Sequence, residues 1–355
     1  MKRLYGIGLP LQDAERAIAT LRKMELFLGG YDFQRAERTI TIPIVRELSR
    51  QEEEIFRAQF PAFQVKETLF EPVISKPTKL QDAIGEEIPS SLVSLLPRSL
   101  DIIGDIAVLE LPAELEAYAN DVGNGILRIN PHVRLVVKKL GEVAGQYRTR
   151  SFQVVAGAGT TETVHYEFSS SYRLDLTTVY FNPRLSHERL RVAHEVGEHD
   201  VVVDMFAGVG PYSVLIAKSQ PRTKIYSIDI NPAAIRYLKE NIFSNRVADQ
   251  VIPLLGDARL FSEEKVRSIA NRVVMNLPSE AEKYLPAALQ MLKPDGGIIH
   301  FYQFVTREKP IRSIECEFRS SIEAVQRRVE SFKFCKVIRE IAPGKVQVAI
   351  DAVIR

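Results

Sequence analysis

Short apolar runs alternate with segments of helical spacing through the second half of the chain, from about residue 186. The runs predict strands at Asp200–Asp204, Lys224–Ile228, Val251–Leu255, Arg272–Asn276 and Gly297–Phe304. Helical patterns occupy Pro211–Ser219, Pro232–Asn241, Ser262–Ala270, Ser279–Leu292 and about Pro310–Val329, and Ser186 can cap a further helix that begins at His187. Two last strands follow at Phe332–Glu340 and Val346–Ile354. Strands that alternate with helices predict a parallel sheet with helices on both faces.

The middle of the chain has a different pattern, in which short strands are separated by glycine and serine turns. Strands are predicted at Asp101–Leu111, Val133–Val137, Phe152–Val155, Thr163–Phe168 and Tyr172–Val179, with a helix from Ala113 to about Asn120 after Pro112. This ladder of short strands indicates a compact antiparallel sheet, mixed with helix.

The first 65 residues predict a small α/β module. Leu11–Leu26 has helical spacing, Thr39–Val45 alternates like a strand until Pro43 interrupts it, and a second helix fits Glu47–Gln59. The stretch Glu71–Pro97 is rich in proline, lysine and serine, which is typical of a partial linker. A chain of 355 residues is long enough for such an arrangement. We therefore expect three domains, over residues 1–65, 66–185 and 186–355.

Composition excludes several classes of protein. Hydrophobic residues make up 45% and charged residues 26% of the chain, which is ordinary for a globular protein. No apolar run approaches the length of a membrane span, and the N-terminus lacks the apolar core of a signal peptide. We expect a cytoplasmic protein without a membrane partner. Cys316 and Cys335 lie outside any Cys/His cluster, so no structural metal is expected.

The net charge of +2 does not by itself indicate a nucleic-acid-binding protein. Basic residues are nevertheless crowded into the middle third, at Lys138, Lys139, Arg148, Arg150, Arg173, Arg184, Arg189 and Arg191. Charge alone favours a solvated face as the explanation.

The strongest local signal is the segment Val201–Pro211, in which a β-branched strand ends at Asp204 and opens into a Gly-x-Gly turn before a helix. Glycine lets the backbone turn tightly and approach a ligand, so this turn, with Phe206 and Gly208, is a candidate cofactor site. Asp229 ends the second strand and can accept hydrogen bonds from ribose hydroxyls, and Asp257 follows the third strand, where it can accept from an adenine amine. Such groups converge beyond the carboxyl ends of parallel strands.

The residues around the turn distinguish between cofactors. No third glycine follows Gly210 at the spacing of a dinucleotide site, and Pro211 has no N–H to offer a phosphate. Asp204 would repel a diphosphate but attract the ammonium or sulfonium of S-adenosylmethionine. We therefore predict S-adenosylmethionine rather than NAD. The fourth strand ends in Asn276-Leu277-Pro278, where Asn276 can orient a planar substrate or hold the cofactor, or can cap the following helix.

Together with several other segments, these residues make the sequence resemble the archaeal and eukaryotic tRNA (guanine-37-N1)-methyltransferase family. The matching segments are Leu96–Ala107, Val179–Arg189, Asp204–Gly210, Asn276–Pro278 and Ala342–Asp351. The resemblance covers about residues 80–355, and the first 65 residues match the family's small N-terminal domain only loosely. It implies a class I (Rossmann-like) methyltransferase domain, preceded by a mixed α+β RNA-binding domain and the small α/β domain.

The resemblance also implies roles for individual residues. Glu188 matches the family's general base, Arg148 its catalytic arginine and Tyr180 an aromatic residue that helps to place guanine, with Asn276 and Pro278 completing the catalytic set. Cofactor contacts are implied for Arg189, Asp229, Ile230, Asp257, Ala258 and Asn276, in addition to Asp204, Phe206 and Gly208 in the glycine turn. By residue type alone, Glu188 would be a first-turn acid that complements the helix dipole, and Arg148 a surface arginine.

The implied reaction explains why these residue types are needed. Guanine N1 carries a proton, which a carboxylate must accept as the methyl arrives, and the charge that gathers on O6 is stabilised by a guanidinium. The nucleotide must leave its stack to present this edge, and Tyr180 or Phe181 could stack on it. Either aromatic residue could equally belong to the core.

The implied partner is tRNA, the implied oligomeric state is a monomer, and no protein partner is implied. The crowded basic residues would then contact phosphates, and removing residues 1–65 is expected to weaken tRNA binding without affecting cofactor binding. Three alternatives stay open: aminocarboxypropyl transfer to the same tRNA position, methylation of a tricyclic guanosine derivative there, and RNA binding without catalysis. Assistance by magnesium also stays open.

Overall fold

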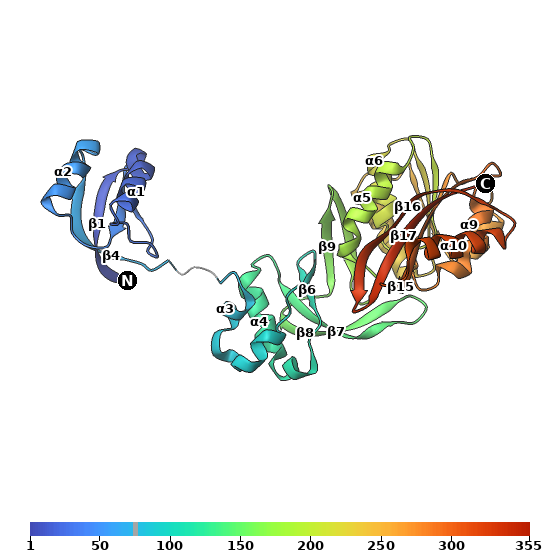
Figure 1. The fold of residues 1–355 in the computed structure, drawn as a ribbon, viewed down its shortest axis with the longest axis horizontal. Coiled ribbons are helices and arrows are strands. Elements are labelled where there is room, and N and C mark those ends of the chain that lie inside the picture. The colour runs from blue at the N-terminus through green and yellow to red at the C-terminus, as the bar shows by residue number, and fades with distance from the viewer. Residues whose placement is uncertain (74–76) are drawn as a thin grey trace. The chain divides into compact units, whose positions relative to one another are not determined.

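The computed structural model describes residues 1–73 and 77–355 and divides into two compact units, Met1–Thr78 and Lys79–Arg355 (Figure 1). Each unit is described by itself. Part of the predicted linker Glu71–Pro97, residues 74–76, lies outside the described residues. The rest contains the helix α3 (Leu80–Ile84) and two 3₁₀ turns, Gly85–Glu87 and Ser90–Leu95. Within the described part of the chain, no helix combines the length and the apolar character needed to cross a bilayer.

The unit Met1–Thr78 is an antiparallel four-stranded sheet with two helices. The strands are β1 (Lys2–Pro10), β2 (Gln34–Arg35), β3 (Thr39–Ile44) and β4 (Gln64–Phe70), in the order β2-β3-β1-β4, and the helices are α1 (Ala14–Lys23) and α2 (Arg50–Gln59). The sequence pattern missed β1 and β4. In β1 the glycine Gly6 leaves room for Phe70, whose ring would lie 2.7 Å from an added Cβ. The strand β3 also continues through Pro43, because β2 pairs only as far as Thr41.

The first part of the unit Lys79–Arg355 contains a mixed sheet instead of the antiparallel one that was predicted. Its strands are β5 (Asp101–Ile103), β6 (Ile106–Leu109), β7 (Leu135–Ala144) and β8 (Thr149–Gly157). The predicted single strand Asp101–Leu111 is two strands, because Gly104 turns the chain at φ +59°. The strands β6 and β7 pair in parallel, and a 3₁₀ turn (Ala113–Tyr118) and helix α4 (Ala119–Ile129) connect them. The strands β9 (Glu162–Glu167) and β10 (Ser170–Asp175) form a separate hairpin.

The β7–β8 hairpin is longer than the sequence pattern predicted, and Arg148 lies in its turn. The strands pair antiparallel as far as Ala144 and Thr149. The turn that joins them has two residues at positive φ, Gly145 at +70° and Arg148 at +54°. An arginine at positive φ is uncommon, because its Cβ crowds the backbone in that conformation. The hairpin therefore presents the Arg148 side chain at its tip.

A seven-stranded sheet forms the rest of this unit and confirms the predicted Rossmann-like fold. The strands are β11 (Val201–Asp204), β12 (Lys224–Asp229), β13 (Val251–Leu255), β14 (Arg272–Met275), β15 (Gly297–Thr306), β16 (Val329–Ala342) and β17 (Lys345–Ile354). Their order is β13-β12-β11-β14-β15-β17-β16, in which the first five are parallel and β17 and β16 are antiparallel. The strand order reverses beside β11, where ligands bind in sheets of this kind.

Helices cover both faces of this sheet (Figure 1). One hydrophobic core lies under α5 (Ser186–Glu195), α6 (Pro211–Ser219) and α7 (Pro232–Ser244), and the other lies under α8 (Ala258–Glu263), α9 (Leu285–Met291) and α10 (Ile311–Glu323). The predicted helix Ser262–Ala270 is wrong, because α8 begins at Ala258 with Asp257 as its N-cap and ends at Glu263. The predicted helix Pro310–Val329 is also shorter, since β16 begins at Val329.

Candidate active site

The carboxyl ends of three neighbouring parallel strands bring polar side chains to one edge of the sheet. Asp229 ends β12, Asp204 ends β11, and Asn276 directly follows β14. Because β11 pairs with β12 on one side and with β14 on the other, these three residues lie at adjacent strand ends. The sequence pattern predicted this convergence.

Asp204 is the most deeply buried acid of this edge, with 1% of its surface exposed. Its Oδ2 accepts a hydrogen bond from the Ser213 hydroxyl at 2.8 Å, and Ser213 in turn accepts from Ser227 at 2.7 Å. Its Oδ1 is buried and has no donor among the described residues. Burial raises the pKa of Asp204 to about 7. A buried carboxylate oxygen without a donor is costly, which indicates that a donor or cation belongs beside it.

The glycine turn is fixed by Asp229. The Gly208 N–H donates to Asp229 Oδ2 at 2.7 Å, and the Asn231 N–H donates to Oδ1 at 2.8 Å. Gly208 has φ +56° and Gly210 has φ +90°, and a Cβ on Gly210 would lie 2.4 Å from Leu238 Cδ1. Burial raises the pKa of Asp229. The acid therefore shapes the turn and keeps further lone pairs for a ligand.

The third acid, Asp257, lies in a more exposed setting. Its Oδ1 accepts from the Arg259 backbone N–H at 2.9 Å, as the cap of α8, and its Oδ2 pairs with the Arg259 guanidinium at 2.5 Å. The hydrogen bond from Arg259 lowers the pKa of Asp257. The guanidinium lies over the Tyr284 ring, which meets Phe206 edge-on with ring centres 4.9 Å apart. An aromatic and guanidinium wall thus adjoins Asp257.

The segment Asn276–Pro278 meets the β7–β8 hairpin. Asn276 Oδ1 is buried without a donor among the described residues, so the Asn276 side-chain oxygen does not cap the following helix. The Arg148 Nη1 donates to the Ser279 hydroxyl at 2.6 Å, one residue after Pro278. A hydrogen bond between residues this far apart in sequence places the hairpin tip over the end of β14.

Glu188 lies in the first turn of α5 and is 8% exposed. Arg191 donates to both of its oxygens, from Nε at 2.9 Å and from Nη2 at 2.6 Å, and the Tyr302 hydroxyl donates to Oε1 at 2.8 Å. Among the described side chains, no hydrogen bond or ion pair joins Glu188 to Arg148. Burial raises the pKa of Tyr212, and the charges of Glu188 and Asp204 raise it further, so Tyr212 lies near both acids.

The two aromatic residues before α5 have different settings. Phe181 is 9% exposed and packs against His165 and Tyr172, so it belongs to the core. Tyr180 is 45% exposed, and its backbone carbonyl oxygen would lie 3.8 Å from a Cβ on Gly208. Tyr180 is therefore the aromatic residue that lies beside the glycine turn.

Arg189 anchors this segment from inside the protein. It is 2% exposed, pairs with both Glu167 oxygens at 2.7 and 2.6 Å, and donates from Nη1 to the Asn182 carbonyl at 3.1 Å. Its guanidinium also lies over the Phe181 ring. These contacts hold the Tyr180–Asn182 segment in place. Direct contact of Arg189 with the cofactor stays a prediction, as it does for Ile230 and Ala258.

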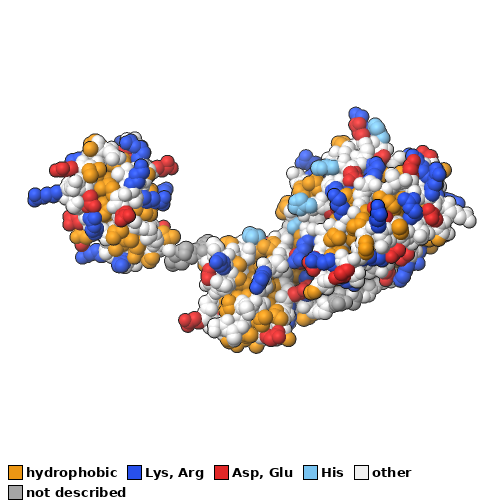
Figure 2. All heavy atoms as spheres, viewed as in Figure 1, with side chains coloured by type: hydrophobic (Ala, Val, Ile, Leu, Met, Phe, Trp, Pro, Cys, Tyr) orange, Lys and Arg blue, Asp and Glu red, His pale blue; other side chains and the backbone are white. Residues whose placement is uncertain are grey.

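Most of the crowded basic residues have acidic partners. Seven of the eight form ion pairs: Lys138 with Glu116, Lys139 and Arg150 with Glu110, Arg173 with Glu162, Arg184 with Asp101, Arg189 with Glu167, and Arg191 with Glu188. In Figure 2, Lys and Arg side chains are likewise interspersed with acids over the visible face. The expectation of a phosphate-contacting cluster is therefore too broad, since Arg189 and Arg191 serve internal pairs. Arg148 has no carboxylate partner among the described side chains.

A surface depression of about 930 Å³ lies away from this edge. It is lined by residues of the β5–β6 turn and the β9–β10 hairpin, among them Gly104, His165, Tyr166 and Arg173. None of the predicted site residues lines it. Arg173 is paired with Glu162, another lining residue, so the depression offers little unpaired charge. We assign the site to the strand ends instead.

Several polar residues at the site were not identified in the sequence. Ser213 and Ser227 support Asp204, Arg259 and Tyr284 adjoin Asp257, and Arg191 and Tyr302 hold Glu188. Only Arg191 had a signal, because it lies three residues after Glu188 on a predicted helix and so on the same face. Arg259 follows Asp257 by two residues, whereas Ser213, Ser227, Tyr284 and Tyr302 come from other strands and helices.

Comparison with known proteins identifies relatives for nearly the whole chain. The TRM5/TYW2 methyltransferase domain matches residues 163–326, and the TYW2 N-terminal domain matches residues 80–160. The tRNA (guanine(37)-N(1))-methyltransferase Trm5b of Pyrococcus abyssi is 36% identical over 98% of this chain and 98% of its own length. The solved complex of aTrm5 and tRNALeu has a TM-score of 0.79, 30% identity and 99% coverage of both chains.

A relative named for a different activity matches a smaller part of the chain. The tRNA(Phe) (4-demethylwyosine(37)-C(7)) aminocarboxypropyltransferase of Pyrococcus horikoshii is 32% identical over 273 residues, which is 77% of this chain and 95% of that one. About a quarter of the present chain thus has no counterpart in this relative, whereas the Pyrococcus abyssi protein matches 98% of it.

Proposed function

The chain belongs to the TRM5/TYW2 methyltransferase family, and on that premise we propose that it transfers the methyl group of S-adenosylmethionine to N1 of guanosine 37 in tRNA. The observation that carries the proposal is a pair of buried oxygens without donors, Asp204 Oδ1 and Asn276 Oδ1, at adjacent strand ends under the tip of the β7–β8 hairpin. Similarity to a guanine-37 methyltransferase over 98% of both chains supports the choice of substrate.

The donor set fits S-adenosylmethionine, which supplies an electrophilic methyl on a sulfonium when bound. Its ammonium group would satisfy a buried acceptor such as Asp204 Oδ1, and its positive charge would favour the ionised form of that acid. Asp229, already bonded to Gly208, keeps lone pairs that can accept from ribose hydroxyls. The wall formed by Phe206 and Tyr284 offers apolar surface for a purine ring.

In the proposed reaction, Glu188 accepts the guanine N1 proton and Arg148 stabilises the charge on O6. N1 of guanine attacks only as its proton leaves, and Glu188 is the acid whose two oxygens accept three donated hydrogen bonds. Arg148 has a guanidinium with no carboxylate partner among the described side chains, so it is free to donate to the O6 that gains charge. The proposal requires Glu188 and Arg148 to meet at the guanine, which enters between α5 and the hairpin tip.

Tyr180 is suited to hold the displaced base. Its side chain is exposed, its backbone carbonyl lies beside Gly208, and Arg189 bonds the segment that carries it. An aromatic ring held at this place can stack on a nucleotide that has left the anticodon loop. Pro278 lies between Asn276 and the residue that Arg148 contacts, and it keeps that segment rigid.

The test is a methyl-transfer assay with tRNA transcripts that carry G or A at position 37. A one-carbon gain on guanosine 37, dependent on S-adenosylmethionine and absent from the A37 transcript, is the expected result. Mass analysis of the nucleoside separates this product from an aminocarboxypropyl derivative. Binding of tRNA without modification by the wild-type protein would contradict the proposal.

Asp204→Asn is expected to weaken S-adenosylmethionine binding and to change how the free energy of unfolding depends on pH. A carboxyl whose pKa is raised on folding stabilises the folded state below its unfolded pKa, and that contribution is lost as the pH rises to about 7. Asparagine does not titrate, so above this range the variant without ligand is expected to gain up to about 4 kcal/mol over wild type. Loss of a charged acceptor is expected to weaken cofactor binding at least about tenfold.

Denaturant unfolding at pH 5 and pH 8, together with calorimetric titration of the cofactor, measures both effects. Asp249→Asn is the matched control, because Asp249 is exposed on the loop before β13. An equal stability difference between Asp204→Asn and wild type at the two pH values would show that Asp204 has no raised pKa.

Removal of the unit Met1–Thr78 is expected to weaken tRNA binding and to leave cofactor binding unchanged. The cut is placed after Thr78 because β4 pairs with β1 and belongs to the first unit. Both cores beside the seven-stranded sheet lie within Lys79–Arg355, so the cofactor site keeps its support. A second binding module on the same chain raises affinity through effective concentration, and its loss is expected to cost roughly 10²-fold. Filter binding of tRNA tests this; equal tRNA affinity for the two proteins would refute it.

A further inference from the structure

A group of charged side chains is bonded to Glu188 through Arg191, and the proposed reaction gives these side chains no role. Arg191 gives Nε and Nη2 to Glu188, and its Nη1 donates to Glu195 Oε1 at 2.6 Å and to Asp351 Oδ2 at 2.5 Å. The guanidinium also lies 4.0 Å from the centre of the Phe334 ring. One cation therefore serves three carboxylates and is held in place by an aromatic face.

Asp351 is fixed by a fully buried histidine. His300 on β15 and Asp351 on β17 are cross-strand partners, and His300 Nδ1 lies 2.8 Å from Asp351 Oδ1. Both residues are 0% exposed. The Arg272 Nη1, which can only donate, faces His300 Nε2 at 3.5 Å, so Nε2 accepts and Nδ1 carries the proton. The Nδ1–H of the imidazole therefore donates to Asp351.

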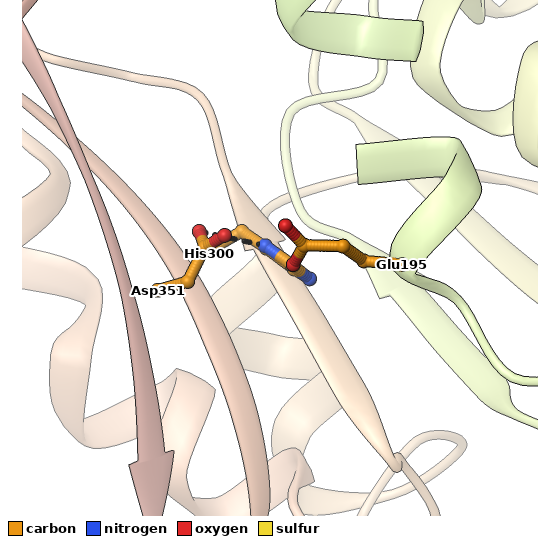
Figure 3. A group of neighbouring side chains, drawn as sticks. All are labelled: Glu195, His300 and Asp351. Atoms are coloured by element: carbon orange, nitrogen blue, oxygen red, sulfur yellow. Dashed lines mark hydrogen bonds and ion pairs between the residues drawn. The ribbon is translucent and has the colours of Figure 1, made fainter. Parts of the chain in front are cut away.

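Arg191 supplies the cation of this cluster. Glu195, His300 and Asp351 converge from α5, β15 and β17 (Figure 3), and their ligand atoms lie within 4.8 Å of one another, as in a metal site. However, Arg191 Nη1 already bonds the carboxylates of both Glu195 and Asp351. The group is therefore explained as an arginine held by two acids.

This sharing matters for a buried base. Burial disfavours an ionised carboxylate and donated hydrogen bonds favour that form, so the donors Arg191 and Tyr302 offset the burial of Glu188. A guanidinium paired with Glu188 alone would be left uncompensated once Glu188 became neutral, which is strongly unfavourable in the interior. Asp351 and Glu195 remove that penalty because they stay paired with Arg191.

We propose that Arg191, shared among Glu188, Glu195 and Asp351, is the positioning residue for the proton transfer. It holds the Glu188 carboxyl group oriented, and it stays ion-paired with Glu195 and Asp351 after Glu188 has taken the N1 proton. The inference rests on the proposed function. In the step, the N1–H bond breaks and its proton goes to a Glu188 oxygen. The electron pair left on N1 forms the bond to the methyl carbon, and the pair of the broken carbon–sulfur bond stays on sulfur.

The pKa values of two tyrosines and one acid near Glu188 are shifted away from neutral pH. Burial raises the pKa values of Tyr212 on α6 and Tyr302 on β15, so both phenols stay protonated. Burial opposes ionisation of Asp351 on β17, but His300 and Arg191 hold its pKa below the usual range. Glu195 on α5 and His300 on β15 also face this cluster, Arg272 on β14 faces His300, and Arg189 on α5 acts on Tyr212.

The test compares pH profiles of kcat, in the whole 355-residue chain, for substitutions at Arg191 and at Glu195, which are expected to move the profile in opposite directions. Arg191→Met removes the cation, so the acid limb of the profile moves to higher pH by about one unit or more and activity partly recovers in alkali. Arg191→Lys keeps a cation, so its acid limb is expected to lie between those of wild type and Arg191→Met. Glu195→Gln leaves Arg191 with one acid fewer besides Glu188, so the acid limb moves to lower pH and the plateau falls. None of the three variants changes the dissociation constant of S-adenosylmethionine.

Glu195 is partly exposed, so Glu195→Gln is expected to fold and can test the inference even if Arg191→Met does not fold. Arg319→Met, at a partly buried arginine of α10 that bonds only the Val329 carbonyl among the described residues, is the control and keeps the wild-type profile. A uniform loss at every pH, or movement of both acid limbs in one direction, overturns the inference. Failure of the proposed function is distinguishable, because it appears as a wild-type protein that forms no methylated guanosine.

Discussion

Glu188→Gln is expected to lower kcat for methyl transfer to tRNA by about 10²–10⁴-fold, the range typical for loss of a general base. Glutamine keeps the size of the side chain but cannot take the guanine N1 proton. The dissociation constants of S-adenosylmethionine and tRNA are expected to stay near the wild-type values, because Glu188 bonds protein groups on α5 and β15 and not the strand ends. Single-turnover rates with a G37 transcript measure the chemical step directly.

The matched control is Glu198→Gln, which removes an acid just after α5 whose partner, Arg222, is on the surface. That variant is expected to keep the wild-type rate, since exposed ion pairs contribute little. A Glu188→Gln protein that binds cofactor normally and methylates at the wild-type rate would remove Glu188 from the mechanism.

The cofactor edge could be predicted from the sequence because its signals are local. A buried β-branched run that ends in an acid and a glycine turn needs no knowledge of distant residues, and the next strand ends repeat the pattern at Asp229 and Asn276. Alternating strands and helices then determine that these ends share one edge. The structure brings Asp204, Asp229 and Asn276 together in this way.

The groups around the proposed base could not be predicted, because strand order and not sequence spacing brings them together. His300 and Asp351 meet only because β17 returns antiparallel beside β15, a pairing that the apolar pattern of either strand leaves open. Asp257 illustrates a different limit. The same side chain caps α8, and this cap moved the start of the helix four residues ahead of the predicted Ser262.

The spacing of basic residues along the chain is also a poor guide to a surface that could contact phosphates. Basic residues close in sequence were assigned to one surface, but most pair with acids from other elements, as Arg184 does with Asp101 and Arg173 with Glu162. Such pairs contribute little stability where they are exposed, yet they leave less free positive charge for phosphates. Arg148 differs from these residues, because it has no carboxylate partner among the described side chains and bonds the Ser279 hydroxyl instead.

Arg148→Ala is expected to lower kcat by about 10²–10³-fold, the effect of removing one donor to an oxygen that gains charge in the transition state. The hydrogen bond to Ser279 shows that the hairpin tip reaches the end of β14, so the guanidinium is held where the guanine is proposed to enter. Arg148→Lys is expected to restore only a small part of the rate, because an ammonium lacks the planar fork of donors. Rapid-quench methyl transfer at saturating tRNA measures the effect on the chemical step.

The control for Arg148→Ala must separate catalysis from the shape of the turn. Arg148 has φ +54°, and alanine at that position carries the same backbone strain, so the hairpin is expected to keep its conformation. Arg150→Ala, two residues along in β8, removes a cation that pairs with Glu110 and leaves the turn intact. Its methyl-transfer rate is expected to stay close to wild type. If both substitutions lower the rate equally, or if Arg148→Ala raises only the KM for tRNA, then Arg148 binds phosphate in the ground state and does not stabilise O6.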